Sequence, residues 1–166
     1  METNYIFRQA KKEEIQAVFD LIMDRVAWMD HVGIRQWNMT KYDQRYPLDY
    51  YEQRRQMEEL FVLTDEAGQI LAVGALLHED ERWPAQASAY YPHHLASRVD
   101  AKGAGSRFLQ MAEDYTAARG KRYMRLDSAV GNAALERFYT SRGYVAAGFC
   151  KDGMYEGILR QKELSL

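Results

Sequence analysis

The sequence predicts an α/β (α+β) fold, in which strands and helices form a single domain over residues 1–166. Short apolar runs with strand character alternate with longer segments whose apolar residues recur at helical spacing. Two pairs of strand-like runs are separated by only a few turn-forming residues, which is typical of hairpins. No linker, internal repeat or low-complexity tract is found in the sequence, so a domain boundary is not expected.

The first third of the chain combines a strand with helical segments. Asn4 to Arg8 predict a short strand. From Lys11 onward an apolar stripe predicts a long helix, and this stripe consists of Ile15, Val18, Phe19, Ile22, Val26 and Met29. An aromatic, polar segment follows Gly33, and Pro47 breaks any long helix within it. We expect a second, short helix from Tyr51 to Glu59.

A hairpin and a third helix are predicted next. Phe61 to Thr64 and Ile70 to His78 have strand character, and Asp65 to Gln69 between them have hairpin chemistry. A pair of glycines then precedes a helix that ends at Gly120. The apolar stripe of this helix consists of Phe108, Leu109, Ala112 and Tyr115.

The last third of the chain predicts a strand, a helix and a second hairpin. Lys121 to Asp127 have strand character. Asn132 stands where a helix N-cap belongs, and Gly143 ends the helix, whose apolar face includes Leu135, Phe138 and Tyr139. Tyr144 to Cys150 and Met154 to Gln161 predict two strands, and the Asp-Gly pair between them is a strong hairpin signal.

Composition and charge exclude several classes of protein. A hydrophobic fraction of 47% and a charged fraction of 28% are ordinary for a globular domain. The net charge of -2 and the pI near 6.1 leave no broad basic surface for nucleic acid. A local basic cluster is expected to be a solvated helix end and strand, and it consists of Arg119, Lys121, Arg122 and Arg125.

Cysteine usage and the amino terminus indicate the compartment. Cys150 is the single cysteine, so the chain forms no internal disulfide. Met1 to Asn4 are polar and lack the apolar region of a signal peptide, and no apolar run is long enough to span a bilayer. We therefore expect a cytoplasmic protein with no membrane partner.

Gly103 and Gly105 mark the candidate ligand site, directly before a helix. Glycine lets the backbone turn sharply and approach a ligand closely. The first amides of a helix lack internal partners, and with the helix dipole behind them they favour an anion. The loop is a candidate phosphate cradle, and a tight strand-to-helix turn is the alternative that the glycine pair alone leaves open.

The order of these motifs resembles the GCN5-related N-acetyltransferase superfamily, whose coenzyme A loop is written Arg/Gln-x-x-Gly-x-Gly/Ala. The matching segments are His93-His94-Leu95-Ala96, Ala101 to Gly105, Arg125-Leu126-Asp127, Asn132 to Tyr139 and Arg142-Gly143-Tyr144. The resemblance implies a mixed, mostly antiparallel central sheet flanked by helices. It also implies two splayed strands at an acetyl-CoA site.

The resemblance further implies an acetyl-CoA-dependent N-acetyltransferase and assigns roles to its residues. Backbone groups of Leu95 and Ala96 match the positions that bind the pantetheine arm and the thioester carbonyl, which gives Leu95 a catalytic role. Tyr139 matches the tyrosine that protonates the coenzyme A sulfur, and a packed structural tyrosine is the alternative. Asn132 would contact pantetheine or serve only as a helix cap. The pyrophosphate would bind the main-chain amides of Ala101, Lys102, Gly103, Ala104, Gly105 and Ser106.

Asp100 departs from the pattern of the superfamily, because it stands where Arg or Gln is preferred. A carboxylate beside a pyrophosphate would be repulsive. Either Asp100 points away from the ligand, or neighbouring cations compensate for its charge. The candidates for compensation are Arg98, Lys102 and Arg107.

The base that deprotonates the acceptor amine is not fixed by the sequence. An alkylamine has a pKa near 10, so a base or a water chain must remove a proton around neutral pH. Four candidates lie on or beside predicted strands, namely His78, Glu79, His94 and Asp127. Arg125 and Asp127 alternate with apolar residues, which is typical of the solvated face of a strand near a sheet edge. His93 and His94 would point to opposite faces of a strand, and the histidines lack metal-ligand spacing, so no metal is expected.

The acceptor is expected to be a primary amine of a small molecule, an amino acid or a peptide. Five aromatic residues are candidates for its pocket, because in the superfamily the segments that hold them form that side of the cleft. They are Trp28, Trp37, Tyr42, Tyr46 and Trp83, and Gly33-Ile34-Arg35-Gln36-Trp37 is familiar from acceptor sites of the superfamily. The same aromatic residues would suit a core or a homodimer interface.

Two alternatives to the enzyme remain to be weighed. A non-catalytic acyl-coenzyme A sensor or interaction module of the same fold is favoured by Asp100 and by the lack of an obvious base, and release of free thiol distinguishes it from an enzyme. A nucleotide-binding protein is discounted, because the third glycine of a dinucleotide fingerprint and the P-loop motif are both missing.

Overall fold

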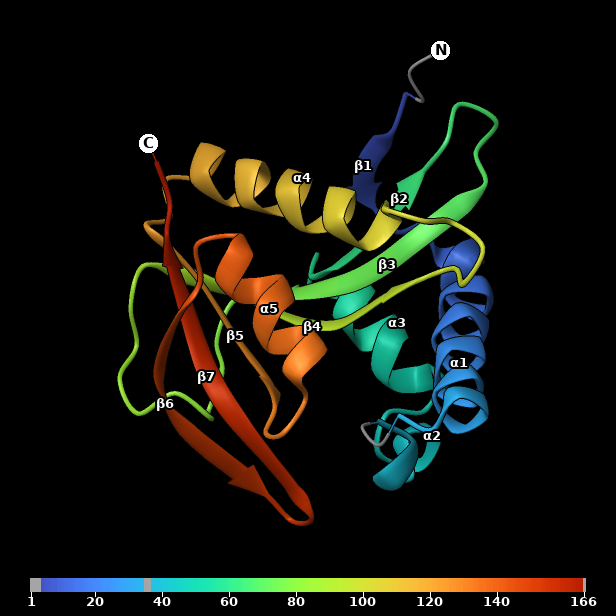
Figure 1. The fold of residues 1–166 in the computed structure, drawn as a ribbon. Coiled ribbons are helices and arrows are strands. Elements are labelled where there is room, and N and C mark those ends of the chain that lie inside the picture. The colour runs from blue at the N-terminus through green and yellow to red at the C-terminus, as the bar shows by residue number, and fades with distance from the viewer. Residues whose placement is uncertain (1–3, 35–36, 166) are drawn as a thin grey trace. The chain divides into compact units, whose positions relative to one another are not determined.

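The structure, a computed structural model, describes residues 4–34 and 37–165 (Figure 1). Its strands are ordered β1-β2-β3-β4-β5-β7-β6 in a seven-stranded sheet. The chain divides into two compact units. The first unit consists of the residues up to Leu76 together with His93–Ala112, and the second of Leu77–Pro92 and the residues from Glu113 onward. That residues 1–166 form a single domain stays a prediction.

The first unit contains three antiparallel strands. They are β1 (Ile6–Gln9), β2 (Leu60–Thr64) and β3 (Ile70–Leu77). β2 is buried along its whole length, because β1 pairs with one of its edges and β3 with the other. The hairpin predicted between β2 and β3 is confirmed by their antiparallel register.

The long helix predicted near the amino terminus is also confirmed. A short 3-10 helix, η1 (Lys12–Glu14), leads into α1 (Ile15–Val32). Gly33 ends α1 in the left-handed conformation, with a φ of 77°. Apolar residues of α1, including Val18 and Ile22, are buried in the same cluster as Val62 of β2 and Val73 of β3.

The segment after α1 contains more helix than the sequence indicates. It forms a 3-10 helix, η2 (Trp37–Met39), and two helices, α2 (Tyr42–Arg45) and α3 (Leu48–Gln56). Arg35 and Gln36 of the aromatic motif lie outside the described residues. α3 begins earlier than predicted, directly after Pro47, because proline is well tolerated at a helix start.

The helix after the glycine pair, α4 (Ala104–Ala118), begins in the first unit. Phe108 of α4 contacts Phe7 of β1 edge-to-face, with 5.2 Å between the ring centroids. Phe7 in turn stacks on Phe61 of β2 at 5.0 Å. Phe61 and Val62 are consecutive in a strand and point to opposite faces, so α4 and α1 cover opposite faces of this part of the sheet.

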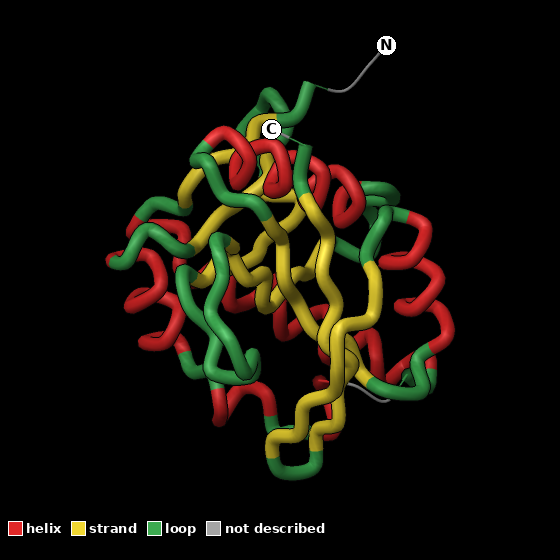
Figure 2. The backbone as a smooth tube through the Cα atoms, turned by 90° about the vertical axis from the view of Figure 1, so that its left-hand side faces the viewer, coloured by secondary structure: helices red, strands yellow, loops and turns green. Residues whose placement is uncertain are grey.

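The second unit is built around β5 (Tyr123–Ala129). β4 (Ala89–Ser97) pairs in parallel with β5 at Ala89 and Tyr90. On its other side β5 pairs antiparallel with β7 (Tyr155–Glu163), which pairs with β6 (Val145–Asp152). Figure 2 shows β6 and β7 as a long hairpin whose turn lies at the bottom of the view, which confirms the second predicted hairpin.

The expectation that Arg125 and Asp127 lie on the solvated face of a strand is wrong. β5 pairs with β7 along its whole length but with β4 only at Tyr123 and Met124. Both side chains are partly buried in polar contacts rather than solvated, which the alternation of residues along the strand does not reveal. None of the helices within the described residues is long and apolar enough to cross a membrane.

Candidate functional site

The loop between β4 and α4 has the backbone geometry of an anion cradle. Ala101 N–H donates to Arg98 O at 3.1 Å and Ala104 N–H to Ala101 O at 3.2 Å, and these two bonds shape the turn. The amides of Gly103 and Gly105 donate no backbone hydrogen bond to any described residue. They belong to the turn and the first residues of α4, where the helix dipole is positive. The loop can therefore bind a phosphate through its main chain.

The two glycines of the loop are needed for different reasons. Gly103 has a φ of 82°, a left-handed conformation that side chains other than glycine rarely adopt. Gly105 has no such φ, and a Cβ added there would lie 3.5 Å from the Ser97 hydroxyl, an ordinary contact. Packing within the protein therefore does not require glycine at position 105. The close approach of a ligand would require it.

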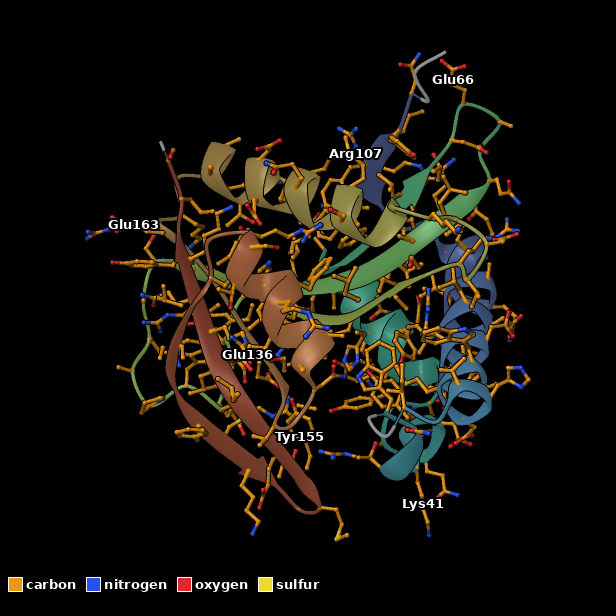
Figure 3. The ribbon with its side chains drawn as sticks, in the orientation of Figure 1. Lys41, Glu66, Arg107, Glu136, Tyr155 and Glu163 are labelled. Carbon is orange, nitrogen blue, oxygen red and sulfur yellow. The ribbon has the colours of Figure 1, made fainter. Side chains whose placement is uncertain are left out.

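The structure shows how the charge of Asp100 is compensated. Arg98 donates to both carboxylate oxygens of Asp100, from Nε at 3.0 Å and from Nη2 at 2.8 Å. The Asp100 side chain is 70% exposed. Of the other two candidate cations, Lys102 is exposed and Arg107 stacks over the Tyr5 ring at 5.3 Å (Figure 3). Arg98 thus neutralises Asp100, and two of its N–H groups are used in doing so.

The end of β4 is fixed by an arginine of α1. Arg25 donates to Ser97 O from Nε at 3.1 Å and from Nη2 at 2.6 Å, and Nη2 also reaches the Ser97 hydroxyl at 3.0 Å. Leu95 is half-buried and Ala96 is buried in the core cluster of the first unit. The strand that carries both proposed carbonyl-binding positions is therefore held firmly just before the cradle.

His94 interrupts the regular course of β4. Its φ is 58°, one of three left-handed conformations of non-glycine residues found in the described part of the chain. The expectation that His93 and His94 point to opposite faces is wrong, because their ring centroids lie only 5.7 Å apart. The left-handed residue breaks the alternation that the expectation assumed. Pro92 was the available signal, because proline inside a strand marks an irregularity.

His94 is the centre of a histidine–tyrosine cluster, which consists of His94, Tyr42, Tyr46, Tyr50 and Tyr51. The Tyr42 hydroxyl is hydrogen-bonded to His94 Nδ1, and the Tyr50 hydroxyl to Nε2 at 2.8 Å. The rings of Tyr46 and Tyr51 contact the imidazole, with centroid distances of 4.4 and 5.8 Å. The whole cluster belongs to the first unit.

The five aromatic residues predicted for an acceptor pocket do not all come together. Trp37 stacks on Tyr42 at 4.7 Å and Tyr42 contacts Tyr46, so these three form one group beside His94. Trp28 instead packs under the Arg25 guanidinium, at 4.6 Å. Trp83 belongs to the second unit, where it is buried beneath Arg125.

Sequence reasoning missed Tyr50 and Tyr51. The available signal was the spacing of Tyr42, Tyr46 and Tyr50, which recur every four residues and so favour a shared face. Pro47, which lies within this run, concealed the pattern. Its effect is to divide the run between α2 and α3 rather than to separate the tyrosine rings.

In the second unit, α5 (Ala133–Ser141) carries the candidate acid. Asn132 caps this helix, accepting from Leu135 N–H at 3.1 Å, so its predicted capping role is confirmed. Tyr139 is half-buried, and its ring contacts Phe138 and Tyr144 at 5.1 and 5.6 Å. Burial, assisted by the negative charge of Asp127, raises the pKa of Tyr139 to about 12. The phenol therefore carries its proton at neutral pH, as a general acid must.

Asp127 is held in a carboxylate cluster, which consists of Asp127, Arg82, Tyr155 and Asp152. The Tyr155 hydroxyl donates to Asp127 Oδ2 at 2.6 Å, and Arg82 contacts Oδ1 at 3.4 Å (Figure 3 labels Tyr155). Arg82 also pairs with Asp152 at 3.1 Å and lies over the Tyr155 ring at 5.3 Å. The two remaining candidate bases, His78 and Glu79, are exposed.

Comparison with known proteins shows the family of the chain and its fold. A model of the acetyltransferase (GNAT) family matches residues 28–144. A GNAT-family acetyltransferase from Listeria monocytogenes has 22% identity and a TM-score of 0.78, with 99% of each chain covered. The PaiA N-acetyltransferase from Thermoplasma acidophilum, solved with coenzyme A, has 15% identity and a TM-score of 0.72, with 96% of this chain and 99% of that chain covered.

A third solved structure carries an acceptor in its name. The ribosomal-protein-S18-alanine N-acetyltransferase from Escherichia coli has 15% identity and a TM-score of 0.68, with 98% of this chain and 96% of that chain covered. These likenesses show that the predicted fold, a mixed and mostly antiparallel sheet flanked by helices, is correct. Among curated proteins, none matches the chain.

Proposed function

Because the chain belongs to the acetyltransferase (GNAT) family, we propose that it is an acetyl-CoA-dependent N-acetyltransferase. Its acceptor is a primary amine of a small molecule, an amino acid or a peptide. The observation that carries the proposal is the loop of Gly103 and Gly105 at the start of α4. The amides of these two glycines donate no backbone hydrogen bond to the described residues. The coenzyme A bound to a structural neighbour supports it as well.

Each requirement of acyl transfer is met by residues of this chain. The main-chain amides of the cradle, from Ala101 to Ser106, hold the pyrophosphate. Backbone groups of Leu95 and Ala96 bind the pantetheine arm and stabilise the oxyanion that forms on the thioester carbonyl. Asn132 contributes a pantetheine contact besides its capping bond.

Tyr139 acts on the leaving group. The amine lone pair forms the new C–N bond by direct attack, and the C–S bond breaks with its electron pair on sulfur. The thiolate then takes the phenolic proton of Tyr139, which prevents the reverse reaction. The raised pKa keeps the phenol protonated near neutral pH, so Tyr139 still holds its proton when the C–S bond breaks.

A non-catalytic acyl-coenzyme A sensor is the second candidate function. It is favoured by Asp100, whose pairing with Arg98 removes a cation that would otherwise be available to the pyrophosphate. A sensor would bind acetyl-CoA and release no thiol, whatever amine is supplied. Thiol release with a panel of amines, amino acids and peptides therefore separates the two functions.

The cradle is tested with a matched pair of variants at one position. Gly105→Glu places a negative side chain where the pyrophosphate binds, and we expect it to abolish acetyl-CoA binding measured by calorimetry. Gly105→Ala adds only a Cβ, in ordinary contact with Ser97, and should remain folded. Unchanged affinity in a folded Gly105→Glu protein would show that the loop is not the cradle.

A further inference from the structure

We propose that Tyr50 and His94 form a proton relay that takes the ammonium proton of the acceptor. The inference rests on the proposed acetyltransferase function. It identifies the base that deprotonates the acceptor amine, to which no residue has yet been assigned. Tyr50 contacts the acceptor nitrogen, and His94 holds the proton behind it. The inference stands on the left-handed backbone at His94, on the two hydrogen bonds of its imidazole, and on the burial of the surrounding rings.

The backbone at His94 adopts a left-handed conformation, with a φ of 58°. This conformation brings the Cβ of a residue other than glycine too close to the following carbonyl oxygen. Such strain is found where the surrounding structure imposes it, most often at functional sites. Here the strain places the imidazole between two hydroxyls from the segment after α1, while Leu95, the next residue, belongs to the strand that binds the thioester.

The hydrogen bonds of His94 define a direction for the proton. A neutral imidazole donates from one nitrogen and accepts at the other. With Nδ1–H donating to the Tyr42 hydroxyl, Nε2 accepts from the Tyr50 hydroxyl at 2.8 Å. Tyr42 is 6% exposed and His94 7% exposed, whereas Tyr50 is only half-buried. Tyr50 is therefore the member of this chain of bonds that an acceptor amine can reach.

The relay balances the protons of the reaction. The ammonium of the acceptor gives one proton to the Tyr50 oxygen as Tyr50 passes its own proton to His94 Nε2. The amine lone pair is then free to attack the thioester carbon. After the C–N bond forms, the nitrogen loses its second proton to solvent, and solvent restores the proton that Tyr139 gave to the sulfur. The proton that the relay returns from His94 is therefore the one net proton released to solvent in each cycle.

The surroundings of His94 are suited to a reversible charge. Its titratable neighbours are the hydroxyls of Tyr42 and Tyr50 and the rings of Tyr46, Tyr51 and His93. The two hydrogen bonds of the imidazole run to neutral hydroxyls rather than to carboxylates. Aromatic faces stabilise a cation beside them without binding it permanently.

Two arginines also stack on rings of the cluster. Arg54 lies 5.4 Å from the Tyr50 ring and is paired with Glu59 at 2.7 Å. Arg45 lies 5.6 Å from the Tyr46 ring. Because these positive charges oppose a second cation, they favour return of the proton from His94 to solvent after each cycle.

The test compares two tyrosine variants that remove the same atom. Tyr50→Phe removes the hydroxyl that bonds Nε2. Tyr91→Phe removes a buried hydroxyl that forms no hydrogen bond among the described residues, from a tyrosine of the second unit that has no part in the proposed site. The measurement is kcat/KM for the best amine of the panel from about pH 6 to about pH 10, with acetyl-CoA affinity measured in parallel.

We expect Tyr50→Phe to lower kcat/KM about 100-fold near neutral pH, and the loss to shrink as rising pH supplies free amine. Tyr91→Phe should stay within a few-fold of the unmodified protein at every pH. His94→Gln, if it folds, should behave as Tyr50→Phe does. Acetyl-CoA affinity should be unchanged in all three variants.

Failure of the relay and failure of the proposed function give different results. If no amine releases thiol with the unmodified protein, the acetyltransferase assignment fails and the relay with it. If that protein is active but Tyr50→Phe matches Tyr91→Phe, the relay alone is overturned. A loss for Tyr50→Phe that stays constant with pH also overturns it, because a merely structural defect would not be relieved by free amine.

Discussion

The histidine–tyrosine cluster and the carboxylate cluster each bury a candidate base, but the partners of the base differ. His94 and the side chain of Asp127 are equally buried, at 7% exposure. His94 is bonded to neutral hydroxyls, whereas Asp127 is bonded to a hydroxyl and to the guanidinium of Arg82. Burial therefore does not distinguish a catalytic group from a structural one here.

The partners do distinguish them. Protonating Asp127 would remove the charge that pairs with Arg82 and leave a partly buried guanidinium poorly compensated. Protonating His94 keeps its hydrogen bonds to two neutral hydroxyls, because both can accept from the imidazolium. We infer that Asp127 is a structural anion and that a base is better placed at His94.

The largest effect is expected at Tyr139, the proposed acid. Tyr139→Phe should lower kcat by roughly 10²–10⁴-fold with acetyl-CoA affinity within a few-fold, because a proton donor to the leaving thiolate matters most in the transition state. Tyr144→Phe is the matched control, since its ring contacts Tyr139 but its hydroxyl bonds Glu113 at 3.0 Å. Full turnover by Tyr139→Phe, where chemistry limits the rate, would exclude the acid role.

The raised pKa of Tyr139 gives a second, independent measurement on the same variant. A pKa of about 12 in the folded state, against about 10 in a free phenol, means that folding favours the protonated form. That stability is complete below about pH 10 and is lost as the pH rises towards 12. The free energy of unfolding of Tyr139→Phe, measured with denaturant, should therefore fall less between about pH 10 and pH 12 than that of the unmodified protein.

Cys150 reports on the charge of the carboxylate cluster. Burial, with a further contribution from Asp127, raises the pKa of its thiol to about 11. Against an ordinary thiol this predicts roughly 100-fold slower alkylation by iodoacetamide near pH 8. Asp127→Asn should accelerate the reaction. An unchanged alkylation rate in a folded Asp127→Asn protein would show that the charge of Asp127 does not act on Cys150.

The strands, helices and cradle could be predicted because they depend on local patterns. Apolar spacing located α1 and α4, the Asp-Gly pair located the β6–β7 hairpin, and the glycine pair located the cradle. Errors of a few residues occurred at ends such as that of α3, where Pro47 is compatible with a helix start as well as with a break.

The two polar clusters could not be predicted, because they join residues distant in sequence. Arg82 and Asp152 meet at Asp127 from different loops and strands, and no local spacing records that contact. The left-handed His94 was hidden for a related reason. A strand pattern assumes alternation, and a single residue with positive φ changes which side chains share a face.

Asp127→Asn is expected to weaken the fold more than the chemistry. Loss of the charge leaves Arg82 paired with Asp152 alone, and we expect a destabilisation of about 1–3 kcal/mol. Turnover with the best amine should stay within a few-fold. Asp152→Asn, which alters the more exposed partner, should cost less than about 1 kcal/mol. Denaturant unfolding measures both variants, and loss of turnover in a stable Asp127→Asn protein would reverse the comparison with His94.

The smallest effect is expected at Asp100, which belongs to neither cluster. Asp100→Arg removes the carboxylate and releases Arg98, so two positive charges replace a neutral pair beside the cradle. Exposed pairs of this kind contribute roughly 0–1 kcal/mol, so acetyl-CoA affinity should rise by no more than about fivefold. The gain should be largest at low salt, where screening is weakest, and Asp100→Asn should give a smaller gain because it only releases Arg98. Calorimetry at two salt concentrations measures this, and weaker binding by the arginine variant would mean that the Arg98–Asp100 pair shapes the cradle rather than merely neutralising it.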